Sequence, residues 1–98
     1  MSFHIQIGND EMDITFNIST LLKNAFCTGI GIRRLNGETG KQATVLINHA
    51  IRNLSHNSDL FKVNEQQNEC GTIAHAITDL IKLREMAKRN TRNTMKVF

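Results

Sequence analysis

The chain of 98 residues contains no tryptophan and no tyrosine, and five phenylalanines are its only large aromatic side chains. Proteins that bind single-stranded nucleic acid commonly stack its bases on aromatic side chains. The basic C-terminal stretch holds one such residue, Phe98, at its very end. This scarcity disfavours base stacking as a means of binding nucleic acid.

Cysteines and long apolar runs are also scarce. Cys27 and Cys70 lie far apart without a C-x-x-C spacing, so reduced thiols are expected. No apolar run is long enough to span a bilayer, and the opening residues, 1–4, lack the charged and apolar regions of a signal peptide. We therefore expect a soluble, cytoplasmic protein without a membrane partner, folded as one small domain over 1–98.

The motifs of nucleotide chemistry are incomplete. A P-loop, G-x-x-x-x-G-K-[ST], would need glycine at position 35 and a hydroxyl residue at position 42, where the chain has Leu35 and Gln42. A dinucleotide-binding G-x-G-x-x-G starting at Gly29 would need a third glycine where Arg34 stands. Neither class of nucleotide enzyme is expected.

Side chains for metal binding or catalysis are not grouped either. The histidines fall in different expected elements, and the closest pair, His49 and His56, has no cysteine or carboxylate between its members. No carboxylate pair suited to acid and base roles is apparent. The sequence predicts no catalytic residue, no metal and no cofactor, and hence a protein that is not an enzyme.

Charge is distributed unevenly along the chain, whose net charge is +3. The first 22 residues carry three acids and no lysine or arginine. Six of the twelve cations lie in the last seventeen positions: Lys82, Arg84, Lys88, Arg89, Arg92 and Lys96. Such a cluster can contact the phosphates of a nucleic acid, or it can simply be a solvated helix end whose cations suit the negative pole of the helix dipole.

Period-two alternation at the N-terminus predicts a β-hairpin. Apolar residues alternate with polar ones over 3–7 and again over 12–18, with a turn between. The polar set, expected on the face away from the core, comprises His4, Gln6, Asp13, Thr15 and Asn17. The alternation returns at 94–98, which is expected to add a third strand.

Three helices are expected between these strands: 19–27, beginning at the cap Ser19, then 40–56, and finally 72 to about 90. The predicted fold class is α+β, with an N-terminal β-hairpin, three helices packed on one sheet face and a short C-terminal strand. Leu83 and Met86 widen the apolar surface of the last helix, which suggests a homodimer.

The richest local pattern is the stretch 29–43, which joins four glycines to three cations. Asn36-Gly37 favours a tight turn, and Thr39 with Gln42 forms a T-x-x-Q capping box. Free N–H groups are expected where the next helix starts, so an anion is expected near the loop cations. The expected ligand-binding residues are Asn17, Arg33, Arg34, Asn36, Gly37, Thr39, Gly40 and Lys41. The alternative is that these residues only shape turns and caps.

Three segments carry a resemblance to a known group: Asp13-Ile14-Thr15-Phe16-Asn17-Ile18-Ser19, the stretch 31–43, and Cys70-Gly71-Thr72. They resemble small uncharacterised phage and prophage proteins that read N-I-T-x-N-x-S, then G-I-R-x-L-x-G-x-T-G-x-x-A, then N-G-W-G-[ST]. Cys70 stands where that group commonly has tryptophan. The resemblance implies a viral or mobile-element origin and a cytoplasmic life inside a bacterium, but no activity, because the group has none established.

The sequence thus predicts a non-enzymatic accessory protein that acts on a bacterial host. It would block a host protein or sequester a small anionic ligand such as a signalling nucleotide. Two alternatives stay open: a small nucleic-acid-binding factor that uses the basic C-terminal helix, and a structural component of a phage particle.

Overall fold

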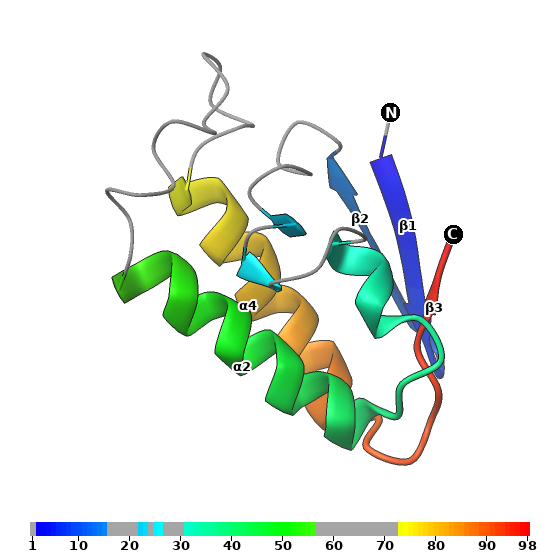
Figure 1. Cartoon of the computed structure of the whole chain (residues 1–98). Helices are drawn as coiled ribbons and strands as arrows, with labels where there is room; N and C mark the ends of the chain where they lie inside the picture. Colours follow the sequence, from blue (N-terminus) through cyan, green and yellow to red (C-terminus); the bar gives the residue numbers. More distant parts are fainter. Residues whose placement is uncertain (1, 16–21, 24, 27–30, 57–72) are drawn as a thin grey trace.

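The structure is a computed structural model that describes residues 2–15, 22–23, 25–26, 31–56 and 73–98 (Figure 1). Its elements run along the chain as two strands, a 3-10 helix, two α-helices and a last strand. In order, they are β1 (Ser2–Ile7), β2 (Asp10–Thr15), η2 (Gly31–Leu35), α2 (Gly40–His56), α4 (Ile73–Arg89) and β3 (Lys96–Val97).

The three strands form an antiparallel sheet with the order β2-β1-β3, so the predicted hairpin and the predicted third strand are confirmed. The hairpin turns at Gly8, whose φ of +58° is a left-handed conformation that glycine adopts without strain. Ile5, Ile7 and Ile14 are fully buried on one face. Of the expected second strand, residues 16–18 lie outside the described part.

Helices α2 and α4 lie side by side, and α4 packs against β2 of the sheet (Figure 1). Residues spaced by three and four positions bury one side of each helix, and this spacing is the pattern of an amphipathic helix. The predicted bounds of 40–56 are confirmed, and those of 72–90 are correct to within one residue at each end. Neither of these two helices is long and apolar enough to cross a membrane.

The expectation of three α-helices is met only in part, because the described residues form two. Most of the helix expected over 19–27 lies outside the described part. The 3-10 helix η2 was not predicted; it turns Ile32 and Leu35 into the core, where they are 1% and 0% exposed. Their spacing of three residues matches the three residues per turn of a 3-10 helix.

The last helix uses more of its apolar surface inside the molecule than the sequence indicated. Leu83 and Met86 are 0% and 5% exposed and belong to the core. The homodimer was inferred from an apolar surface that these two side chains were expected to expose, and they do not expose it. The homodimer itself stays a prediction. Ile81 is the large apolar residue of α4 that remains exposed, with 39% of its surface accessible.

Candidate functional site

The two arginines of the predicted loop are both engaged within the molecule. The Arg33 guanidinium lies over the ring of Phe3, 5.3 Å from its centroid, a cation–π geometry. Arg34 Nη1 lies 2.8 Å from Oε1 of Glu38, four residues further along the chain. Each arginine therefore already has a partner that an incoming anion would have to share.

The turn after these arginines is tied to the C-terminal strand. Gly37 N donates to Met95 O at 2.8 Å, and Met95 N donates to Glu38 O at 2.8 Å. Asn36 Oδ1 accepts a hydrogen bond of 3.0 Å from Val97 N. Asn36 and Gly37 thus extend the sheet's hydrogen bonding to the loop. This is a structural role, as in the alternative that these residues only shape turns and caps.

The start of α2 is closed by the chain itself. Gly40 N donates to Asn93 O at 2.9 Å, and Lys41 N donates to Thr91 O at 3.1 Å. Thr39 Oγ1 accepts from Gln42 N at 3.3 Å, as the capping box predicts. The expectation of free N–H groups at this helix start is therefore wrong, because the segment after α4 occupies them.

The remaining predicted ligand-binding residues are Lys41 and Asn17. Lys41 exposes its side chain without an ion pair among the described residues, whereas Asn17 lies outside the described part. The loop residues from 33 to 41 are brought together on one side of β3, but their backbone donors point into the molecule.

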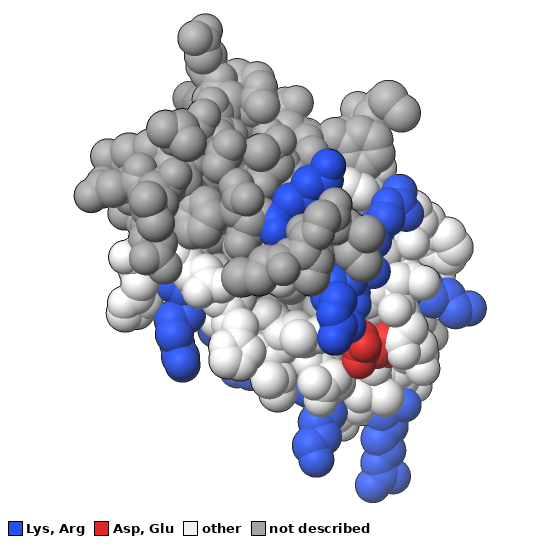
Figure 2. Space-filling view, in the orientation of Figure 1, with Lys and Arg blue, Asp and Glu red and all other residues white. Residues whose placement is uncertain are grey.

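Three of the six cations in the basic C-terminal cluster have acidic neighbours. Arg89 Nε lies 3.3 Å from Asp10 Oδ2, Lys88 Nζ 3.8 Å from Glu85 Oε1, and Arg84 Nε 3.6 Å from the same Glu85 oxygen. Lys82, Arg92 and Lys96 have no ion pair among the described residues. Figure 2 shows lysine and arginine side chains spread over the face of the molecule on which α2 lies in front, with one small acidic area.

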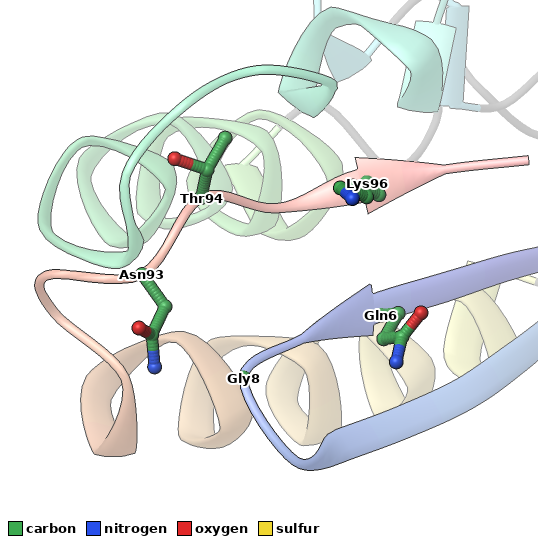
Figure 3. Close-up of a pocket in the computed structure, with 5 residues that line it drawn as sticks. All are labelled: Gln6, Gly8, Asn93, Thr94 and Lys96. Carbon is green, nitrogen blue, oxygen red and sulfur yellow. The ribbon is translucent and has the colours of Figure 1, made fainter.

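A polar pocket of about 310 Å³ lies where the hairpin turn meets the segment after α4 (Figure 3). It is lined by Gln6, Gly8, Asn93, Thr94 and Lys96. Gln6 and Lys96 are directly paired across β1 and β3, so both side chains leave the same face of the sheet. This lining has one ammonium group, two amides and a hydroxyl, and it includes no carboxylate.

Only one residue of this pocket, Lys96, was among the candidates drawn from the sequence. Gln6 and Lys96 are 90 positions apart, and no local motif connects them. The usable signal was the predicted pairing of the C-terminal strand with the hairpin, because such pairing must place polar residues of both strands on one face.

A second hollow, of about 300 Å³, is lined by Ala25, Phe26, Arg34, Leu46, His49 and Asn53. Its walls are mostly apolar. Its one arginine, Arg34, forms the ion pair with Glu38 described above. Asn53 Nδ2 donates to the Ala25 carbonyl at 2.8 Å. The charge of Arg34 in this hollow is thus already compensated by Glu38, whereas Lys96 has no ion pair among the described residues.

The open face of the sheet also carries a histidine between two carboxylates. His4 Nδ1 lies 2.7 Å from Asp13 Oδ1, and Nε2 lies 3.5 Å from Glu11 Oε2. The hydrogen bond with Asp13, helped by the charges of both carboxylates, raises the pKa of His4 above its ordinary 6.5. Among the described residues, no group of three or more His, Cys, Asp or Glu side chains has the arrangement of a metal site.

We expect Asp13→Asn to lower the pKa of His4 toward 6.5, and Glu11→Gln to lower it less, since the hydrogen bond to Asp13 is the largest cause of the shift. An NMR titration of the His4 ring protons measures both. A raised pKa in the folded state means that this contact stabilises the fold below the unfolded pKa and that the contribution is lost as the pH rises through the folded value. An unchanged pKa in Asp13→Asn would contradict the assignment.

Comparison of the chain with protein-family models, with curated proteins and with solved structures finds no match.

Proposed function

We propose that this protein is a non-enzymatic binding protein that holds a small anionic ligand in the polar pocket at Lys96. One observation carries the proposal: the pocket combines amide and hydroxyl donors with an ammonium group that has no ion pair among the described residues, and the described lining includes no carboxylate. Hydrogen bonds that involve a charged group are stronger than neutral ones, and an anion can accept several at once.

The size of the pocket limits the ligand. About 310 Å³ is at the lower end of the range for small-molecule sites, so an inorganic anion or the phosphate end of a nucleotide fits better than a large cofactor. The neighbouring loop cations, Arg33 and Arg34, are engaged elsewhere and are not needed for this role.

The resemblance to phage and prophage proteins supports a biological setting for such binding. In that setting the protein acts in the cytoplasm of a bacterial host, where it removes a small anion such as a signalling nucleotide from circulation. In the other form of the same accessory role, the protein binds a host protein and blocks it.

The test is an NMR titration of the protein with inorganic phosphate and with mononucleotides. We expect amide shifts at residues 6–8 and 93–96, and at least tenfold weaker binding in Lys96→Gln, since a charge-assisted hydrogen bond contributes about 1.5–3 kcal/mol. Lys82→Gln is the matched control, because it removes an exposed cation that does not line this pocket, and it should bind as the unaltered protein does.

Two outcomes would overturn the proposal in different ways. Amide shifts that are confined to residues 31–43 and are lost in Arg34→Ala or Lys41→Ala would place the binding site in the glycine-rich loop instead. Binding that responds only to duplex or single-stranded nucleic acid and weakens steeply with salt would favour the nucleic-acid alternative, with Lys82, Arg92 and Lys96 as its phosphate contacts.

A further inference from the structure

The strand β2 is an edge of the sheet, and among the described residues its outer side has no neighbouring strand. An edge strand presents unpaired N–H and C=O groups to any extended segment that reaches it. Natural proteins protect such edges with lysine, proline or bulges. β2 has six residues in regular register with β1, and it carries neither lysine nor proline.

The two sides of this edge differ in chemistry. On the open face of the sheet, β2 presents Glu11 and Asp13. On the helix side, Met12 opens onto a hollow of about 330 Å³ whose other lining residues belong to α4: Ile81, Lys82, Glu85, Met86 and Arg89. A strand added beside β2 would therefore meet an apolar pocket on one face and carboxylates on the other.

We propose that β2 accepts an extended segment of another protein, paired antiparallel, in which an apolar residue opposite Met12 is flanked on both sides by lysine or arginine. Side chains alternate along a strand, so the apolar residue enters the hollow beside Ile81 while its two neighbours lie next to Glu11 and Asp13. Opposite charges directly across a strand pair are favourable, and like charges are unfavourable.

The acidic face selects the charge of that partner. His4 is the basic group that contacts Glu11 and Asp13, and its ring brings at most one positive charge against two negative ones. Lys96 lies on the same face but on β3, at the other edge of the sheet. At the β2 edge the two carboxylates outnumber His4 in either protonation state, so basic residues are the complement of this edge.

A second copy of this chain is a poor occupant of the same edge. Antiparallel β2–β2 pairing can be centred on Glu11, Met12 or Asp13 with Met12 still on the helix side. These three registers place Glu11 opposite Glu11, Glu11 opposite Asp13, or Asp13 opposite Asp13 of the other copy, and each sets like charges against each other. The edge is thus guarded against self-association while it stays open to a basic strand.

The experiment uses the full chain and two synthetic peptides, T-V-K-I-K-T and its charge-reversed counterpart T-V-E-I-E-T. We expect the first to bind with amide shifts centred on residues 10–14, and the second to bind at least tenfold more weakly. In the double variant Glu11→Lys with Asp13→Lys the preference should reverse. Equal binding of both peptides, or binding of neither at millimolar concentration, would overturn the proposal.

A pair of surface variants tests the hollow. Ile81→Asp should weaken binding of the lysine peptide at least tenfold, whereas Val45→Asp, which changes a somewhat more exposed apolar residue on α2, should leave that binding unchanged. Lys96→Gln should also leave it unchanged, which separates this edge from the anion pocket. Loss of peptide binding in Val45→Asp but not in Ile81→Asp would contradict the proposed binding site at β2. A dimer in light scattering that Glu11→Lys with Asp13→Lys alters would contradict the protection of this edge against self-association.

Discussion

Gly40→Ala is expected to destabilise the protein by about 3 kcal/mol, although the same change in a helix ordinarily stabilises it by roughly 0.5–1 kcal/mol. The reason is the contact between the start of α2 and the end of α4. A Cβ at Gly40 would lie 2.5 Å from Ala87 O and closer still to Asn90 O, and both are backbone atoms that cannot rotate away. Urea unfolding monitored by circular dichroism measures the change.

Gly37→Ala is the matched control for this prediction. Gly37 has a φ of +87°, but a Cβ there meets no atom within 4 Å. The control therefore isolates the backbone cost of a left-handed conformation, about 1–2 kcal/mol, without a clash. If Gly40→Ala were as stable as the unaltered protein, the two helices would approach each other less closely than described.

The second large effect is expected at Asn90, where α4 ends. Asn90 Nδ2 donates to Asp10 Oδ2 and to Met86 O, each at 2.8 Å, and Asn90 Oδ1 accepts from Asn93 Nδ2 at 3.1 Å. One side chain thus joins the hairpin, the helix end and the segment that lines the polar pocket. Asn90→Ala removes all three bonds and leaves Asp10 Oδ2 with the longer contact to Arg89 Nε, so we expect a loss of about 2 kcal/mol.

The pH dependence of this variant provides an independent check. The hydrogen bond from Asn90, with a smaller effect of Arg89, lowers the pKa of Asp10 below 3.8. A lowered pKa stabilises the fold above the unfolded value, and that contribution is lost as the pH falls through the folded one. Asn90→Ala should therefore flatten the acid side of the stability profile. Asn48→Ala removes a solvent-exposed hydrogen bond from Arg84 and is the control. It should change neither the free energy of unfolding nor its dependence on acid pH appreciably.

The elements that the sequence predicted well are those determined by nearby residues. The bounds of α2 follow from the Thr39 cap and from an apolar stripe that ends at Leu54, and both signals lie within the helix or beside it. The alternation at β1 and β2 depends likewise on neighbours in the chain. Local signals of this kind are sufficient when tertiary packing agrees with them.

The features that the sequence did not reveal depend on residues far apart. The carbonyls of Thr91 and Asn93 close the start of α2 although they lie about 50 positions later, so no pattern around Gly40 indicated that its N–H group would be occupied. The same segment brings Asn93 and Thr94 to the turn at Gly8 and so builds the pocket. Glycine-rich loops before helices have a strong association with anions, but here the N–H groups of Gly40 and Lys41 donate to carbonyls of residues 91–93.

The closure of α2 by residues 91–93 has a consequence for the order of events during protein synthesis. The ribosome delivers residues 40–56 well before 91–93, so in nascent α2 the N–H groups of Gly40 and Lys41 lack their later partners while the rest of the chain is made. Contacts between distant positions slow folding, because a long loop must close before they are gained. The nascent helix is therefore expected to become stable only after residues 91–93 have left the ribosome.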